Sequence, residues 1–512
     1  MRRRRALFVV ASALNLLLFW AYPGNATGRV PIGTGLETLD YWTTEHPFVD
    51  EFKISRPWFS VTGEKEDGRL LDLDKNGWVR SLKPGQIART ILLSTVGSPS
   101  AIPAVRRYVV EYEGEGKIEY AWSARLAESS PGRDLIDVDV STEGAVQLQL
   151  VSVDPANHVR NIRMTEEGGK AAPSEIFNPV FLGRLKGYKT LRFLAWMPDV
   201  EKGQRRWRER PTLQDAQWSV KGAPVELMVA LANRLHTDVW FSMPYAADDD
   251  YFRRFALVLA KSLDPKLKVY AEYSNEVWNP IYPVSRYAEK KGLALGLSEE
   301  PAEARTRFYA KRAVEMFTIF EQDLGKKRLV RVLSGQSGNT AVSETALSYG
   351  DTKDHVDALA TAPYFGYYLS GDPEASAKTV KMSLDELMNE LANTAVPAAK
   401  KEMLDEAAVA RKYGLPLIAY EGGQHLVDFR PDAEHAPALD ALYDAANRDP
   451  RMGALYTRNL QDWTEAGGGL FLHLQNCGPY DMHGRWGALE YINQPRAEAP
   501  KFDALMRFME GK

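Results

Sequence analysis

Two glutamates of the chain have neighbours that suit acid–base and nucleophilic chemistry. Glu276 lies in "AEYSNEVWNP" (271–280), directly after the strand-like run "LKVY", and Glu421 lies in "IAYEGGQHL" (418–426). Two carboxylates that share a site can cleave a glycosidic bond, since the protonated one donates to the leaving oxygen while the ionised one attacks the anomeric carbon. Repulsion raises the pKa of one carboxyl group, and hydrogen-bond donors keep the other ionised.

The rest of the sequence indicates how the two glutamates could meet. From about residue 175, short apolar runs alternate with helical stretches, a pattern typical of a parallel sheet. The strand-like runs are 31–42, 190–197, 238–245, 268–276, 328–336, 358–366, 416–423 and 469–476. Eight such units predict an α/β fold, a closed (β/α)8 TIM barrel formed by residues 31–59 and 171–512. A doubly wound open sheet is the alternative, but the sequence lacks the glycine-rich phosphate turn that usually follows its first strand.

In a (β/α)8 barrel, chemistry collects at the carboxyl ends of the strands. Glu276 ends the fourth predicted strand and Glu421 ends the seventh, on the opposite side of the barrel. We therefore expect the two carboxyl groups to converge, at the separation of about 5–5.5 Å that a retaining mechanism needs. The alternative is that each glutamate is a salt-bridged residue of the rim.

Residues 60–170 have a different sequence pattern. Their strand-like segments alternate in polarity, a glycine-containing hairpin falls at 114–116, and no helical period is present. These features predict a β-sandwich-like domain inserted after the first barrel strand, with a core of its own and no catalytic residue.

The motifs "SNEVW" and "YEGG" resemble the acid/base and nucleophile motifs of the clan A glycoside hydrolases, which are (β/α)8 barrels. The resemblance implies Glu276 as acid/base and Glu421 as nucleophile. It also implies that Asn275 binds the sugar 2-hydroxyl. The motifs "SRPW", "RFLAW" and "EYSNEVWN" are similar, in addition, to those of bacterial proteins labelled cellulose-binding.

Further site residues follow from the same resemblance. Arg192 and Tyr364 correspond to the Arg and Tyr that donate to the nucleophile in several members of the clan. The sequence departs from the pattern at strand three, where Tyr245 stands in place of a frequent His, and at strand eight, where the usual terminal Trp is missing. His473 or Trp486 is expected to form the floor of the sugar site instead.

Two residues beside the fourth strand are predicted from their position. Trp278 follows the strand end and is a candidate for stacking on a sugar ring. Glu272 lies two residues before Glu276, so it points to the same face but deeper in the barrel. We expect Glu272 to be a structural partner of Arg192, because an unpaired buried Arg would cost several kcal/mol.

Composition excludes several classes of function. The net charge of −4 is spread along the 512 residues and provides no basic surface for nucleic acid. Cys477 is the only cysteine, which excludes an intramolecular disulfide and a zinc site built from thiolates. No metal and no cofactor is expected.

The first residues predict export. "MRRRR" is followed by an uncharged apolar run of 16 residues and then by small residues. This order is typical of a secretory signal, residues 1–26, cleaved after Ala26. The alternative is an uncleaved inner-membrane anchor, which would be the chain's one contact with a membrane. Either way, the rest of the chain is expected in the periplasm or outside the cell.

Together these patterns predict an exported retaining glycoside hydrolase that acts on a β-linked polysaccharide or exopolysaccharide. One alternative is a carbohydrate-binding protein that has lost catalysis on the same barrel. Another is a scaffold component of a polysaccharide-secretion system.

Overall fold

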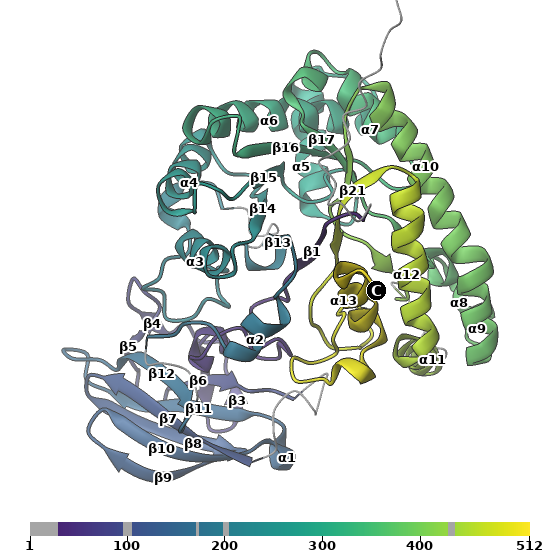
Figure 1. Cartoon of the computed structure of the whole chain (residues 1–512). Coiled ribbons are helices and arrows are strands. Elements are labelled where there is room, and N and C mark those ends of the chain that lie inside the picture. Colours follow the sequence, from purple (N-terminus) through teal and green to yellow (C-terminus); the bar gives the residue numbers. More distant parts are fainter. Residues whose placement is uncertain (1–28, 96–104, 170–173, 198–203, 429–435) are drawn as a thin grey trace, which may run out of the picture.

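The structure is a computed structural model that describes residues 29–95, 105–169, 174–197, 204–428 and 436–512 (Figure 1). The predicted signal or anchor, residues 1–26, lies outside the described residues. Within the described part of the chain, no helix has the length and apolar character needed to cross a membrane.

Eight parallel strands close into a barrel. Each barrel strand pairs with the next barrel strand along the chain, and the last pairs with the first. The barrel strands are β1 (Ile32–Gly35), β13 (Thr190–Arg192), β14 (Asp238–Met243), β15 (Val269–Tyr273), β16 (Leu329–Ser334), β17 (Ala358–Thr361), β19 (Leu417–Ala419) and β21 (Gly468–His473). The predicted (β/α)8 barrel is confirmed, with Glu276 just beyond the fourth strand and Glu421 just beyond the seventh.

Helices surround these strands on the outside (Figure 1). They are α2 (Pro179–Arg184), α3 (Val225–Leu235), α4 (Asp249–Ser262), α5 (Pro283–Ala294), α6 (Pro301–Leu324), α7 (Thr340–Ser348), α8 (Pro373–Thr379), α9 (Leu384–Glu390), α10 (Val396–Lys412), α11 (Ala436–Arg448), α12 (Pro450–Glu465) and α13 (Pro500–Glu510). Their first turns carry ordinary start signals. The Asp248 side chain accepts from the Tyr251 backbone N–H at the start of α4, and proline occupies the first turn of α5, α6, α12 and α13.

Alternate strand residues fill the inside of the barrel. Trp240 and Tyr270 stack there with ring centroids 5.3 Å apart, and Ile418 and Leu472 belong to the same buried cluster. Space is tight, because a Cβ at Gly33 would come within 2.2 Å of the Leu472 side chain. The strand residues that alternate with these inward-facing ones, such as Phe471, pack outward against the helices.

A block of antiparallel strands follows β1 and lies to one side of the barrel (Figure 1). One sheet has the order β12 (Arg160–Glu166), β7 (Val105–Glu113), β10 (Arg133–Asp139), β9 (Ala124–Ser130), and the other has the order β3 (Lys65–Glu66), β2 (Phe59–Thr62), β6 (Ile87–Leu92), β11 (Val146–Val153), β8 (Gly116–Trp122). A hairpin of β4 (Asp72–Leu73) and β5 (Val79–Ser81) and the short helix α1 (Val140–Glu143) complete the block. We call residues 59–166 the β-block.

The β-block has a hydrophobic cluster of its own, distinct from the two clusters of the barrel. The chain crosses between them within a few residues, since Phe48 belongs to the barrel cluster and Phe52 to that of the β-block. Phe52 stacks on Trp78 with centroids 5.5 Å apart. Gln217 then ties the β-block to the barrel, because its amide donates to the hydroxyl of Thr90 in β6 at 3.3 Å, and it also donates to Ser55 of the connecting segment at 2.7 Å.

Candidate active site

A cavity of about 610 Å³ opens where the barrel strands end. Its walls come from residues after β15 (276–282), β16 (336–339), β17 (362–367), β19 (420–425) and β21 (474–486), together with Glu402 of α10. Glu276 and Glu421 both line it. Among the described residues, the β-block contributes none of the lining.

Glu421 is held by a guanidinium group. Arg192, the last residue of β13, donates to Glu421 Oε2 at 2.8 Å. Both side chains are nearly inaccessible, with Arg192 1% and Glu421 8% exposed. Charge-assisted pairs of this kind favour the ionised carboxylate. The predicted contact between strand two and the seventh-strand glutamate is therefore present.

Glu272 completes the surroundings of Arg192. Its Oε2 accepts from Arg192 at 3.0 Å, from Trp240 Nε1 at 2.8 Å and from Ser242 at 2.8 Å, and its Oε1 accepts from Ser334 at 2.5 Å. The prediction that Glu272 is a structural partner of Arg192 is confirmed. With both oxygens bonded beneath the cavity, Glu272 serves to fix the guanidinium.

Glu276 has a different environment. Its carboxylate accepts from the Tyr420 hydroxyl at 3.0 Å and from the Asn279 amide at 2.8 Å. Burial, and next the charge of Glu421, raise the pKa of Glu276 to about 7. A carboxyl group with this pKa carries a proton for a large fraction of the time near neutral pH.

The backbone around Glu276 is strained. Ser274 and Glu276 have φ values of 62° and 44°, in the left-handed region that residues with a Cβ rarely adopt. Such conformations persist where the surrounding structure enforces them, and they cluster at functional sites. From this turn Glu276 lines the cavity.

The pKa of Glu421 reflects opposing influences. Burial raises the pKa of Glu421 above its ordinary value, an effect that Arg192 and a hydrogen bond from Tyr364 oppose and that the charge of Glu272 reinforces. Tyr364 begins β18 (Tyr364–Phe365), which pairs in parallel with β20 (Gly423–Gln424), so that Tyr364 lies opposite Gly423. This small parallel pair extends the barrel at strands six and seven and places the tyrosine beside Glu421.

Aromatic rings form part of the cavity wall. Trp278 and Trp486 both line it, and Trp486 packs against Tyr364 and His425 with centroids 5.8 and 5.1 Å away. Rings of this kind offer flat apolar faces to a sugar.

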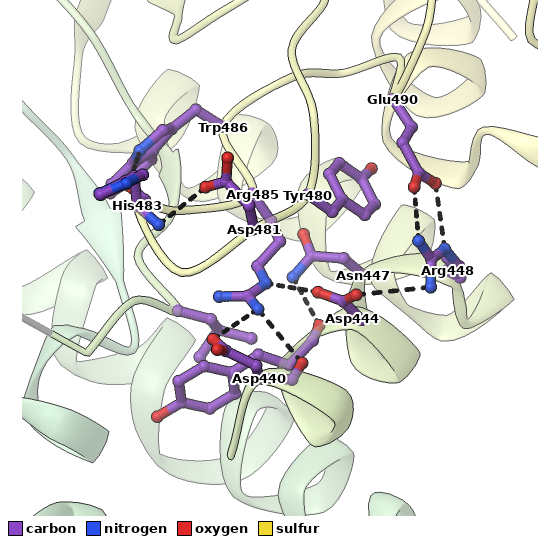
Figure 2. A network of polar contacts seen from close by, with 12 residues as sticks. Asp440, Asp444, Asn447, Arg448, Tyr480, Asp481, His483, Arg485, Trp486 and Glu490 are labelled. Atoms are coloured by element: carbon purple, nitrogen blue, oxygen red, sulfur yellow. Dashed lines mark hydrogen bonds and ion pairs between the residues drawn. The ribbon is translucent and has the colours of Figure 1, made fainter. Parts of the chain in front are cut away.

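The loop that carries Trp486 is fastened to α11. Arg485, fully buried, bonds Asp440 at 2.7 Å and Asp444 at 2.6 Å (Figure 2). The backbone carbonyl of Arg485 accepts from Gln424 and Lys501 at 2.8 and 2.5 Å. The residue before Trp486 is thus fixed through both its side chain and its backbone.

Two residues predicted to touch a sugar lie elsewhere. His473 is fully buried and bonds Tyr456 of α12 at 3.2 Å, because Leu472 faces the barrel interior and the next residue faces the helices. Tyr245 packs on Tyr287 of α5 with ring centroids 5.0 Å apart, outside the cavity lining. Of the two residues expected at strand eight, Trp486 therefore lines the cavity and His473 does not, and Tyr245 does not line it either.

Asn275 lies below the cavity surface. Its Oδ1 accepts from Arg192 at 2.8 Å, and the side chain is 6% exposed. Arg192 therefore bonds Glu421, Glu272 and Asn275 together. A hydrogen bond from Asn275 to a sugar hydroxyl stays a prediction.

Sequence reasoning missed Tyr420, Asn279 and Glu402. Tyr420 could have been found, because it lies two residues after the inward-facing Ile418, on the same face of the strand, and immediately before Glu421. Asn279 follows Glu276 by three residues in a turn that the sequence did not specify. Glu402 comes from the middle of α10 and has no local signal. No group of residues suited to a metal ion occurs in the described ranges.

No protein-family model matches the chain, and no curated protein matches its sequence. Among solved structures, it is similar to a 4-O-alpha-L-rhamnosyl-beta-D-glucuronidase from Fusarium oxysporum 12S, with 13% identity and a TM-score of 0.38 over 64% of this chain and 63% of that one. It is also similar to a beta-glycosidase from Thermosphaera aggregans, with 13% identity and a TM-score of 0.37 over 63% of this chain and 82% of that one.

A third similar structure is a broad-specificity endoglucanase from an uncultured bacterium, with 14% identity and a TM-score of 0.35 over 64% of this chain and 82% of that one. The chain spans less than two thirds of the length of the Fusarium enzyme. At these identities and TM-scores the likeness carries no argument about activity. The resemblance to proteins labelled cellulose-binding stays a prediction.

Proposed function

We propose that the protein is a retaining glycoside hydrolase that cleaves a β-linked polysaccharide or exopolysaccharide. One observation carries the proposal: two carboxyl groups line one cavity in different electrostatic environments. Glu421 is paired with a guanidinium, whereas Glu276 receives only neutral donors and has a pKa raised to about 7. A retaining mechanism needs one ionised and one protonated carboxyl group at its start.

In the first step Glu421 attacks the anomeric carbon while the bond to the leaving oxygen breaks. Glu276 transfers its proton to that oxygen, so the leaving group departs as an alcohol and a glycosyl ester remains on Glu421. Arg192 and Tyr364 orient the attacking carboxylate. Trp278 and Trp486 offer faces for the sugar rings.

In the second step Glu276, now ionised, takes a proton from water. The resulting nucleophile attacks the anomeric carbon and releases Glu421 as a carboxylate. Loss of the glycosyl group returns both glutamates to their starting states. Two inversions leave the anomeric configuration unchanged.

The proposal includes export, which the basic and apolar order of residues 1–26 supports. Polysaccharides are too large to reach a cytoplasmic enzyme without transport, so an exported location fits a polymeric substrate. Mass spectrometry of the protein recovered from its native cell tests this step. An intact Met1 on cytoplasmic protein contradicts it.

The decisive experiment is incubation of the purified protein with a panel of β-linked polysaccharides, with new reducing ends as the readout. Proton NMR of the first product then gives its anomeric configuration, and we expect the β form. Initial release of the α form would replace retention by inversion. Glycan binding without any new reducing end would favour the non-catalytic carbohydrate-binding alternative.

Glu406 provides a matched control for this assay. It is a fully buried glutamate whose pKa burial raises to about 7, as in Glu276, but it bonds Ser343 and does not line the cavity. We expect Glu406→Gln to hydrolyse the glycan at the wild-type rate. A loss equal to that of Glu276→Gln would mean that the assay reports folding and not chemistry.

A further inference from the structure

A third carboxylate lines the cavity and has no part in the two-carboxylate mechanism. Glu402, half-buried on α10, accepts from the Tyr367 hydroxyl at 3.1 Å through Oε1 and from the Ser337 hydroxyl at 3.1 Å through Oε2. Both donors are neutral. They fix the direction of the carboxylate without neutralising its charge.

The chain after β16 runs directly over this carboxylate. A Cβ at Gly338 would come within 3.1 Å of Glu402 Oε1, and Gly338 has a φ of 74° that favours glycine. Gln336 and Asn339 beside it line the cavity as well. Glu402 is therefore a fixed part of the cavity wall and not a free surface side chain.

No lysine or arginine lines the cavity among the described residues. The two lysines that precede Glu402 are engaged elsewhere, because Lys401 bonds Asp405 at 2.6 Å and Lys400 bonds Asp462 at 2.8 Å. Arg192, beneath the cavity, is shared between Glu272 and Glu421. One guanidinium for two carboxylates leaves a net negative charge there.

His425, which also lines the cavity, adds no positive charge at neutral pH, since burial lowers its pKa to about 4. The lining thus carries the carboxyl groups of Glu276, Glu402 and Glu421, and His483 is its other histidine. A uronic acid would bring another carboxylate beside these three without a lysine or arginine in the described lining to receive it, at a cost that like charges at short range impose. A positively charged sugar would be attracted.

We propose that the cavity selects a glycan that carries an unacetylated amino sugar, whose ammonium group faces Glu402. The inference rests on the proposed function, because it assumes that a glycan occupies the cavity beside Glu276 and Glu421. It assigns Glu402 as a specificity-determining residue. The ammonium group supplies the donor and the charge that Tyr367 and Ser337 do not.

The test measures binding separately from hydrolysis. Glu421→Gln protein, which lacks the nucleophile, is titrated by calorimetry with matched β-linked oligosaccharides of glucosamine, N-acetylglucosamine, glucose and glucuronic acid. We expect glucosamine oligosaccharides to bind about tenfold more tightly than the glucose series, equivalent to about 1.4 kcal/mol, and the glucuronic series to bind most weakly. The preference should shrink with added salt. N-acetylation, which removes the charge, should abolish it.

Glu402→Gln in the same background should remove most of the preference for glucosamine. Glu390→Gln is the matched control, because Glu390 of α9 likewise accepts from a tyrosine hydroxyl, that of Tyr368 at 2.6 Å, but does not line the cavity. We expect Glu390→Gln to keep the full preference.

The two proposals fail in different ways. Equal binding of glucosamine and glucose oligosaccharides, absence of glucosamine binding, or a preference that survives Glu402→Gln overturns the inference, even if the wild-type protein hydrolyses glycans. Conversely, a preference that depends on Glu402 in a protein that hydrolyses no glycan supports the inference and overturns the proposed hydrolysis.

Discussion

Two pairs of carboxyl groups beyond the ends of barrel strands, Glu276 with Glu421 and Glu37 with Glu45, differ in their access to the cavity. Glu276 and Glu421 line the cavity, with Arg192 behind Glu421. Glu37, two residues after β1, and Glu45 lie in a closed network, 5% and 0% exposed. The donors to this second pair are neutral: Thr43, Thr44, Asn476 and backbone N–H groups, at 2.7–3.2 Å.

The difference shows that a raised pKa does not identify an active site. Burial raises the pKa of Glu45 to about 7, as it does for Glu276, and raises that of Glu37 well above its ordinary range. Access from the cavity and a cation on one member set the first pair apart. Within the described residues, Glu37 and Glu45 form no ion pair, and their charged forms have only hydroxyl and amide donors. The first pair is suited to acid–base and nucleophilic chemistry. The second pair holds the loop after β1 against Asn476, which follows strand eight.

The largest expected effect comes from Glu421→Gln. Without a carboxylate nucleophile no glycosyl ester forms, so we expect kcat to fall by at least about a thousandfold. Thermal unfolding should show an intact fold. Glu45→Gln is the matched change in the closed pair and should leave kcat unchanged. Similar losses in both variants would erase the functional contrast between the pairs.

Glu276→Ala should lower turnover of natural glycans by about a hundredfold to ten-thousandfold, the usual contribution of a general acid–base group. Azide should restore turnover of a substrate with a good leaving group, because such a leaving group needs no proton and the anion replaces activated water. No rescue by azide would count against Glu276 as the acid/base. In the wild type, kcat/KM for natural glycans should fall as pH rises through about 7, because Glu276 loses its proton.

Arg192→Met tests how much the cation beside Glu421 contributes to the free energy of unfolding. It leaves Glu272 and Glu421 buried without their cation, so we expect the free energy of unfolding to fall by about 3–5 kcal/mol. Arg254→Met, which removes an exposed pair with Asp250 on α4, should cost at most about 0.5 kcal/mol. Urea unfolding measures both. A small loss for Arg192→Met would show that water or a proton compensates the two carboxylates.

Much of this architecture could be predicted from the sequence, because strand order and the position of a residue after a strand are local properties. Glu276 and Glu421 follow from the strand ends, whereas Arg192 follows from the resemblance to the clan A glycoside hydrolases. His473 lies away from the cavity because it directly follows the inward-facing Leu472, and one step along a strand reverses the direction of a side chain. Glu402 could not be predicted, since its place in the cavity depends on how α10 packs against the loop after β16.

The closed pair should make stability depend on pH. The pKa of Glu45 is higher in the folded protein than in the unfolded chain, so its contribution is present at low pH and lost as pH rises through about 7. The free energy of unfolding should therefore decline between about pH 5 and pH 8. Glu45→Gln should make this decline shallower, also because it removes the repulsion that raises the pKa of Glu37. An identical slope in urea titrations of both proteins would contradict the raised pKa.

The smallest expected effect concerns the loop that holds Trp486 at the cavity. Asp440→Asn keeps the shape of the side chain that bonds Arg485 but removes its charge (Figure 2). Asp444, Gln424 and Lys501 still hold Arg485, so Trp486 should gain only slight freedom. We expect KM to rise by about twofold to fivefold with kcat unchanged, because in the proposed function the ring contacts the sugar and not the reacting atoms.

Asp503→Asn is the control for this change. Asp503 of α13 also pairs with an arginine, Arg496, at 2.7 Å, but neither residue lines the cavity. Its KM should equal that of the wild type. A fall in kcat with constant KM in Asp440→Asn would instead place the loop in the chemical step. In that case the chemistry at Glu276 and Glu421 would depend on the anchoring of the loop after strand eight as well as on the two glutamates themselves.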